Sequence, residues 1–350
     1  MLSSIPKNTK IPFLYDVAAS RIAGKVPFNL IGYHPAIDTT EEDVWGYGGT
    51  QGTYVFPTAE MAMEVVSSDN TQDIGTVIKG DATGNTVQAD ADGTTTTIED
   101  DSVDFTAGTA VAAGDIVILD PHGTTPEWGY VTAVATNTLT IGNGFSEGGT
   151  GASRYYAVVD KSAYTGGLVI HFHYLDDAYA AHEEIVVLNG TTVVATINTD
   201  IFRVQSSNII GTGSSNAPVG NIFIRNTADT PVYSYISAGY TRSRDMISTI
   251  PAGYTGYMKQ WHVGWATPGD IKVQTARFRG LANAEPLHQF QTGDIFYPYS
   301  EIIVSNSQVE INFDIPLKMP EKTDMRVVGK AFTGGVGPCA MVARGWMEAN

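Results

Sequence analysis

Alternation of apolar and polar residues is the clearest pattern along this chain, and residues 309–315 show it best. Their sequence, Val-Glu-Ile-Asn-Phe-Asp-Ile, holds four apolar and three polar residues in strict period two. Successive side chains of a strand point to opposite faces, so this pattern predicts a strand with one face in a core and the other in solvent. We expect Pro316 to end the strand, because proline has no N–H with which to pair.

The same period of two predicts strands along most of the remaining chain. Further strands are expected at 222–225, 232–236, 271–279 and 325–332. The dipeptide Asn189-Gly190 supplies residues that adopt the positive φ angles of a type I′ turn. It predicts a hairpin between strands at 184–188 and 191–197. A shift of the apolar phase at Ala276 predicts a bulge within its strand.

No segment shows apolar residues that recur with a sustained helical period between helix caps. The best helix candidates are 15–23 and 59–65, and both are short. Strands without helices between them favour an all-β, antiparallel fold of the jelly-roll-like sandwich type. We expect either one long sandwich or two related ones, divided in the second case near 243–253.

Composition supports the all-β prediction and excludes several kinds of protein. Gly (37 residues), Thr (39) and Tyr (17) are abundant, as they are in strands and turns. With 43% hydrophobic residues the chain is too apolar to be disordered, and it has no apolar run of the ~18 residues that a membrane span needs. The single cysteine, Cys339, excludes a disulfide framework and a cysteine-cluster metal site. We expect no signal peptide, because no continuous apolar segment follows Lys7 and Lys10.

The net charge of −17 is unevenly distributed and marks a separate module. Residues 80–153 contain no Lys or Arg, and 81–150 contain eleven acidic residues, which leaves −6 for the other 280 residues. Such acidity excludes broad binding to nucleic acid. Short strands are expected at 116–119, 128–135 and 138–141. They predict a small antiparallel β-barrel, inserted at 76–163, that has its own core and projects from a sandwich body formed by 56–75 plus 164–350.

The first 55 residues differ from the rest because prolines and glycines interrupt them. They include Pro6, Pro12, Pro27, Pro35 and the glycines at 46, 48 and 49. Such a segment is typical of an extended, loop-like arm. We expect residues 1–55 to lie on the body or on a neighbouring subunit as an anchor, so that their deletion leaves a folded body.

A pair of histidines is the strongest candidate for chemistry. His171 and His173 lie at i and i+2 of a predicted strand, and such side chains share one face. With Asp177 as a carboxylate they resemble the metal-binding pair of cupins, an alternative that would make the chain a metal-dependent enzyme. The second histidine motif of a cupin is missing from 293–306. The plainer interpretation places both histidines on a polar or subunit-contact face without a metal ion.

No other motif points to catalysis or to a cofactor. The glycine-rich stretch 211–216 lacks the third glycine of a nucleotide-binding loop. Asp90, Asp92 and the pair Asp100-Asp101 do not match the spacing of a calcium loop, and whether the module binds Ca²⁺ or another ligand stays open. We therefore predict a protein without catalytic residues, cofactor or resident metal ion.

Aromatic residues are the best candidates for contact with a partner. Trp261 and Trp265 share a predicted strand face and could bind a sugar or a neighbouring subunit, and core packing is an equally good interpretation. The full set of candidate partner-binding residues is Trp45, Trp261, Trp265, Tyr297 and Tyr299.

Several segments outside the acidic module carry a resemblance. They lie at 16–24, 28–29, 32–39, 42–45, 48–49, 54–58, 65–69, 250–257 and 320–327. Three of them read GYHPAIDT at 32–39, IPAGYTGY at 250–257 and PEKTDMRV at 320–327. Together they resemble a family of virion structural proteins of tailed bacteriophages that is common in marine phages. The acidic module departs from the family pattern as an addition after Ser67-Ser68-Asp69.

The resemblance implies a virion component built of β-sandwiches and assembled in the cytoplasm of a bacterial host. We expect a non-enzymatic capsid decoration, minor capsid or head-fibre-type protein. It would form a homo-oligomer, with a trimer as the expected symmetry, and bind other virion proteins, with no nucleic-acid or membrane partner. Alternatives are a tail-associated adsorption protein that binds a host receptor or surface glycans, and a jelly-roll major capsid protein. Head or tail location, symmetry and host stay open.

Overall fold

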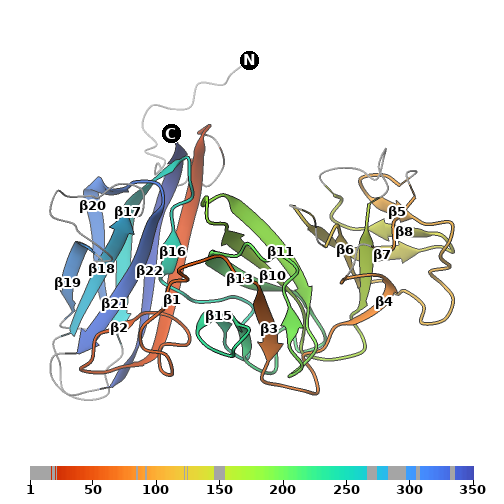
Figure 1. Ribbon diagram of the computed structural model, residues 1–350, viewed down its shortest axis with the longest axis horizontal. Helices are drawn as coiled ribbons and strands as arrows, with labels where there is room; N and C mark the ends of the chain where they lie inside the picture. Colours follow the sequence, from red (N-terminus) through yellow and green to blue (C-terminus); the bar gives the residue numbers. More distant parts are fainter. Residues whose placement is uncertain are drawn as a thin grey trace, which may run out of the picture. The chain divides into compact units, whose positions relative to one another are not determined.

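In the computed structural model the elements formed by the described residues are β-strands, β1 to β22, in antiparallel pairs (Figure 1). The structure describes residues 17, 20, 22–83, 86–90, 93–121, 123, 125–145, 154–265, 274–282, 297–304, 308–331 and 336–350. The predicted all-β, antiparallel fold is confirmed. Of the two helix candidates, 59–65 is wrong, because β3 (Met63–Ser67) begins inside it and is buried throughout.

The chain divides into two compact units. Unit 1 comprises 1–53 together with 244–350, and unit 2 comprises 54–243. The boundary at 243/244 falls inside the range in which the sequence suggested a division. The body expected at 56–75 plus 164–350 is therefore shared between two units, and the arm expected at 1–55 belongs with the C-terminal residues.

Unit 1 contains two sheets. The first has the order β1 (Lys25–Ile37), β22 (Gly337–Ala349), β17 (Tyr254–Trp265) and β20 (Gln308–Met319). The second has the order β16 (Ile247–Thr249), β21 (Thr323–Ala331), β18 (Gln274–Ala282) and β19 (Tyr297–Val304), and β2 (Glu42–Asp43) also pairs with β21.

The pairing in unit 1 is nested. Apart from the short β2, its strands pair first with last (β1 with β22), second with seventh (β16 with β21), third with sixth (β17 with β20) and fourth with fifth (β18 with β19). Two further ladders, β17 with β22 and β18 with β21, join these pairs into the two sheets. Most of this pairing joins residues far apart in the chain.

An apolar core fills the space between the two sheets of unit 1. The first sheet contributes Trp261 and Met341, and the second contributes Ala276 and Val327, all buried. Burial of this kind is the main favourable contribution to folding, at roughly 25 cal/mol for each Å² of apolar surface removed from water. The core therefore defines unit 1 as a two-layer sandwich.

The prediction of an extended arm at 1–55 is wrong for residues 25–37. From Lys25 to Ile37 the chain forms β1, which pairs with the last strand of the chain along its whole length. The prolines of β1 do not prevent strand formation, because β1 is an edge strand and one side of its backbone needs no partner. Pro35 also coincides with a shift of register between His34 and Ile37. Deletion of 1–55 would therefore remove an edge strand of the sandwich instead of a separate anchor.

The expectation that Pro316 ends its strand is also wrong, because β20 continues to Met319. Met258 pairs with Leu317 and Gln260 with Asn312, so residues 313–316 bulge opposite the single residue Lys259. The Lys259 ammonium donates a hydrogen bond to the carbonyl oxygen of Phe313. A bulge on an edge strand accommodates a proline because no ladder hydrogen bond is required of it.

Unit 2 contains three sheets. One has the order β11 (Ala181–Val187), β10 (Gly167–Leu175) and β13 (Arg203–Thr212). Another has the order β12 (Val194–Ala195), β3, β14 (Ile222–Asn226) and β15 (Val232–Ile236). The third, in the acidic module, has the order β4 (Thr76–Gly80), β9 (Tyr156–Asp160), β6 (Ile116–Leu119), β7 (Glu127–Val134), β8 (Thr138–Ile141) and β5 (Thr97–Glu99).

The predicted hairpin around Asn189-Gly190 is wrong. Gly190 has the expected positive φ of 61°, but β11 before it and β12 after it belong to different sheets. The Gly190 N–H donates to the Asp73 carbonyl oxygen (2.8 Å), and its own carbonyl accepts from Ser67 N–H (2.9 Å). The turn therefore crosses between sheets, because these tertiary hydrogen bonds replace the ladder of a hairpin.

In the acidic module the three expected strands are confirmed as β6, β7 and β8. The described pairs run from β4 at one edge to β5 at the other, so the ladder does not close between these two strands as a barrel would. One face of the sheet covers a core of its own, with Phe105, Leu139 and Tyr156 fully buried. The module is therefore an open sheet that covers a hydrophobic core of its own.

The module is attached to the rest of unit 2 through its second face. On β6, Val117 and Leu119 point into the module's own core, whereas Ile116 and Ile118 belong to a second hydrophobic cluster. That cluster includes Leu168, Ile185 and Ile210 from β10, β11 and β13. The Tyr130 hydroxyl donates to the Ile210 carbonyl oxygen (2.9 Å). The module therefore packs against the rest of unit 2 through β6, and its projection from the body stays a prediction.

A buried carboxylate lies where the chain enters and leaves the module. Asp73 is fully buried, and its Oδ1 accepts hydrogen bonds from the N–H groups of Gly167 (2.7 Å) and Val219 (2.8 Å). Its Oδ2 accepts from the Ser67 hydroxyl (2.6 Å) and the Gly220 N–H (2.7 Å). Asp73 thus joins segments on both sides of the module, which is the role of a fully satisfied buried polar group.

We predict that Asp73→Ala destabilises unit 2 by about 3–5 kcal/mol, because buried donors lose their acceptor and have no access to water. The matched control is Asp69→Ala, whose carboxylate accepts from the N–H groups of Thr71 (2.9 Å) and Gln72 (2.6 Å) near the surface. Water can replace that acceptor, so the expected loss is about 1 kcal/mol. Urea unfolding measures both; equal losses in the two variants would contradict the prediction.

Candidate functional site

The tryptophans proposed as partner-binding residues are buried. Trp45 and Trp261 have 0% of their surface exposed, and Trp265 has 3%. Trp261 and Trp265 belong to the sandwich core of unit 1, and the Trp45 indole N–H donates to the Gln51 carbonyl oxygen (3.0 Å). The prediction that these three tryptophans bind a partner is therefore wrong, because a buried ring offers no face to a sugar or partner. They are packing residues.

The two remaining aromatic candidates, Tyr297 and Tyr299, lie on the edge strand β19. Tyr297 pairs with Gly280, and a register shift skips Tyr299 between the pairs of Pro298 and Ser300. The side chains of both tyrosines lie outside the described part of the structure.

The histidine pair is brought together with a carboxylate that the sequence did not indicate. His171 and His173 lie on one face of β10, as expected from the period of two. In the β10–β11 ladder His173 pairs with Glu183 and His171 with Ile185. Directly opposite residues of an antiparallel pair share a face, so Glu183 joins the two imidazoles.

These three side chains form a compact cluster. The His171 Nε2 lies 2.7 Å from Glu183 Oε2, and the His173 Nδ1 lies 3.9 Å from Glu183 Oε1. The centroids of the two imidazole rings are 4.6 Å apart. Burial, together with the neighbouring His171, lowers the pKa of His173, and the hydrogen bond from His171 lowers the pKa of Glu183.

Asp177, the carboxylate proposed as the third ligand, is not part of this cluster. It follows the end of β10 by two residues, is exposed, and donates its backbone N–H to Glu60 Oε1 (3.0 Å). The prediction selected the nearest downstream carboxylate instead of the one across the ladder. The signal that could have found Glu183 is the hairpin itself, which returns through a short turn after Leu175.

Many acidic residues of the module form turns. Their carboxylates accept a hydrogen bond from the backbone N–H of the Thr or Ser two residues later. In the module these pairs are Asp81–Thr83, Asp100–Ser102, Asp104–Thr106 and Asp160–Ser162. Elsewhere they are Asp38–Thr40 and Asp69–Thr71. The spacing D-x-[ST] was a visible sequence signal for such Asx turns, and sequence reasoning missed it.

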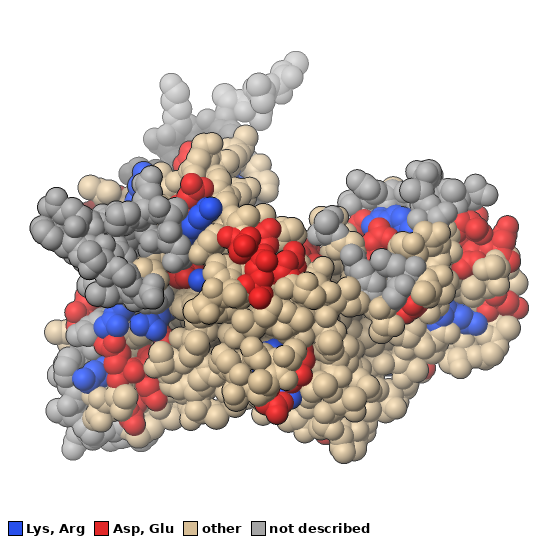
Figure 2. Space-filling view, viewed as in Figure 1, with Lys and Arg blue, Asp and Glu red and all other residues tan. Residues whose placement is uncertain are grey.

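Three of these turns keep an acidic side chain at least partly exposed on the module, at Asp81, Asp104 and Asp160, whereas Asp100 is buried. Figure 2 shows acidic side chains gathered on the module, with basic side chains beside them at two places. Hydrogen bonds from Thr106 lower the pKa of Asp104, which favours its charged form. The acidity of the module therefore has a structural cause in its turn chemistry.

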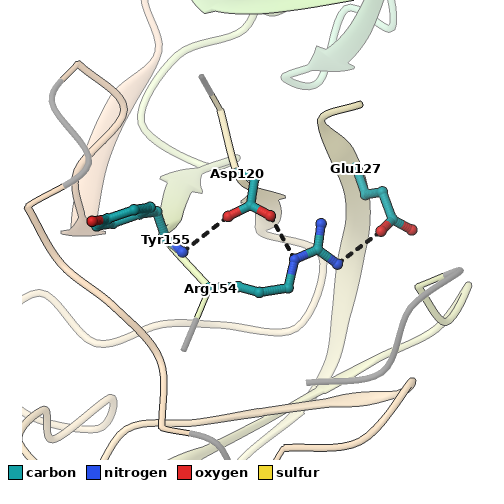
Figure 3. A network of polar contacts seen from close by, with 4 residues as sticks. All are labelled: Asp120, Glu127, Arg154 and Tyr155. Carbon is teal, nitrogen blue, oxygen red and sulfur yellow. Dashed lines mark hydrogen bonds and ion pairs between the residues drawn. The ribbon is translucent and has the colours of Figure 1, made fainter. Parts of the chain in front are cut away.

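One cation ties two strands of the module together (Figure 3). The Arg154 guanidinium contacts Asp120 through Nε (2.6 Å) and Glu127 through Nη1 (2.8 Å). The second oxygen of Asp120 accepts the Tyr155 N–H (3.1 Å). Arg154 is therefore occupied by carboxylates of its own module, next to the start of β7 and the end of β6.

The aspartates considered as calcium ligands have other partners. Asp90 Oδ2 accepts the Asp101 N–H (2.6 Å), and Asp100 accepts the Tyr156 hydroxyl (2.8 Å). Asp92 lies outside the described residues. Among the residues that the structure describes, His171, His173 and Glu183 form the one cluster of three or more potential metal ligands, with all ligand atoms within 4.8 Å of one another.

A buried glutamate lies on the opposite face of β11. Glu184 is 1% exposed, and it lines a groove between β11, β12 and β4. Its carboxylate accepts from the N–H of Ile197 (2.8 Å), the N–H of Asn198 (3.3 Å) and the side-chain amide of Asn198 (3.0 Å). Burial raises the pKa of Glu184 to about 7. Glu184 thus holds the 197–198 segment against the sheet.

We predict that unit 2 loses stability as the pH rises from 5 to 8. The folded-state pKa of Glu184, about 7, exceeds its ordinary value of 4.5, so the folded chain binds the proton more tightly. The stabilisation is complete below pH 4.5 and is lost as the pH passes 7, by about 3 kcal/mol in total. Urea unfolding of the Glu184→Gln variant at both pH values is expected to show a much weaker dependence.

The neighbouring Glu183 provides the control, because its pKa is lowered. Its contribution to stability is present above its unfolded pKa and disappears as the pH falls through the folded pKa, which is the opposite sign. Glu183→Gln is therefore expected to leave the decline between pH 5 and 8 in place. Loss of that decline in Glu183→Gln but not in Glu184→Gln would contradict the assignment.

Within the described residues no helix is both long and apolar enough to cross a membrane. Comparisons with protein-family models, with curated proteins and with solved structures found no match to this chain. The geometry of the two units and the sequence resemblance are therefore the observations from which a function can be proposed.

Proposed function

We propose that this chain is a non-enzymatic structural component of a bacteriophage virion, as a homo-oligomeric capsid decoration, minor capsid or head-fibre-type protein. The observation that carries the proposal is the nested pairing of unit 1, from β1 with β22 to β18 with β19. From this order we infer a jelly roll, a fold found in viral capsid and lectin domains and in cupins.

A fold alone does not select among these functions, since one fold hosts many. The resemblance to phage virion proteins favours the capsid role, and its segments include β1 residues 32–37 and β21 residues 323–327. The cupin alternative loses its motif, because His171 and His173 lie in unit 2 and not between the sheets of this sandwich. The tail-adsorption alternative loses Trp261 and Trp265 as glycan-binding residues, because both are buried.

The open edge of the unit 1 sandwich supports self-association. β20 ends one sheet and β19 ends the other, and the two strands lie next to each other. Ile315 on β20 is 85% exposed and Ile303 on β19 is 62% exposed. Edge strands with unpaired backbone groups and exposed apolar side chains are normally protected, and a second copy of the chain would cover both features.

The virion role is tested by locating the chain in particles. Mass spectrometry of purified phage particles from a genome that encodes this chain is expected to find it at a defined copy number. Imaging of particles labelled with an antibody against the purified chain then places it on head or tail. Absence from purified particles, with the chain present in the lysate, would overturn the proposal.

We predict that Ile315→Lys weakens self-association at least ~10-fold, because a charge on the edge must be desolvated when copies meet, at about 1.4 kcal/mol or more. Analytical ultracentrifugation of the full chain measures the association. Val193→Lys is the matched control, since Val193 is 46% exposed and lies in unit 2. A monomeric wild-type chain, or equal weakening by both variants, would contradict this edge as the contact.

A further inference from the structure

We propose that His171, His173 and Glu183 bind a divalent transition-metal ion, with zinc as the best-fitting type, and that the ion ties β11 to β10. Two imidazole nitrogens and one carboxylate are a ligand set that zinc accepts, with a further position left for water. The site lies in unit 2 and is independent of the proposed virion role.

The distances suit one ion between the three groups. Ligand atoms about 2.1 Å from a tetrahedral ion lie roughly 3.4 Å from one another. The His171–Glu183 and His173–Glu183 separations of 2.7 Å and 3.9 Å fall on either side of that value. All three ligand atoms lie within 4.8 Å of one another, so side-chain rotation without movement of the strands brings them to an ion.

The strands hold the ligands in place before an ion arrives. β10 is the middle strand of its sheet and is paired on both sides, with β11 and with β13. Phe172, between the two histidines, is fully buried on the other face, which fixes the direction in which both imidazoles point. Sites on strands with locked neighbours are more exact than sites on loops.

The cluster is also open enough for an ion to enter. The side chain of His171 is 12% exposed, that of His173 is 42% and that of Glu183 is 33%. On the other side of β10, Asn208 pairs with His171 and Ser206 with His173, so two further oxygen-bearing side chains share this face. Water or one of these oxygens can complete the coordination.

A simple ion pair does not account for the whole cluster. The hydrogen bond between His171 and Glu183 engages one imidazole, yet the second ring lies 4.6 Å from the first, beside the same carboxylate. An ion shared by three ligands uses both rings. Ile185, which pairs with His171, belongs to the cluster that packs against the acidic module, so the ion would stiffen the surface to which the module is attached.

The test uses the full chain after treatment with a chelator. Titration calorimetry with Zn²⁺ is expected to show one ion bound per chain, and Co²⁺ is expected to give the visible absorption of a coordinated ion. Zn²⁺ should also raise the melting temperature of the wild-type chain. His171→Ala and His173→Ala are each expected to weaken Zn²⁺ binding at least ~10-fold, and Glu183→Gln to weaken it in the same direction.

His182→Ala is the matched control. His182 lies on β11 next to Glu183 but faces the other way, stacked on Tyr174 at a centroid distance of 5.4 Å and 3.1 Å from Asp176. It should bind Zn²⁺ like the wild-type chain. Circular dichroism without metal verifies that each variant is folded, and Glu183→Gln, nearly identical in shape, supplies the decisive comparison if an alanine variant is not. No Zn²⁺ binding by the wild-type chain, or equal binding by wild type and Glu183→Gln, would overturn the proposal.

Discussion

The pairing of the first described strand with the last is the constraint on which this structure depends. Because β1 pairs with β22 along its length, a unit inserted between them must begin and end at the sandwich. Unit 2 does so between β2 and β16. The returning chain is fixed within unit 1 by hydrogen bonds from Tyr33 N–H to the Arg244 carbonyl oxygen (3.1 Å) and from Met246 N–H to the Val44 carbonyl oxygen (2.9 Å).

The acidic module repeats this arrangement within unit 2. Gly166 N–H donates to the Gln72 carbonyl oxygen (3.1 Å), and the Asp73 carboxylate accepts from Gly167 N–H (2.7 Å). The closure of a long loop adds little entropy cost per added residue, and a folded insertion whose ends already meet adds less. Unit 2 is inserted in unit 1, and the module is inserted in unit 2. Hydrogen bonds at both junctions hold the ends of each insertion together, so that the enclosing strands are not disturbed.

Several charged residues of unit 2 have a structural role that their contacts explain. Aspartates of the module form Asx turns, Arg154 neutralises two carboxylates of its own module, and Glu184 is buried against the backbone of the 197–198 segment. Two features remain without such an explanation: the exposed apolar side chains of Ile303 on β19 and Ile315 on β20, and the cluster of His171, His173 and Glu183. They lie in different units, so self-assembly and metal binding can succeed or fail separately.

The sequence by itself determined the local features of this protein. Alternation identified the all-β class, short runs between turn residues identified the strands β6, β7 and β8, and the period of two placed His171 and His173 on one face. Such patterns depend on neighbours in the chain. Only the tertiary structure decided which strands pair, that Trp261 faces a core, that Gly190 crosses between sheets, and that Glu183 joins the histidines. Alternation shows that a strand has two different faces but not which distant strand covers either one, because pairing and burial are set by contacts between residues far apart in sequence.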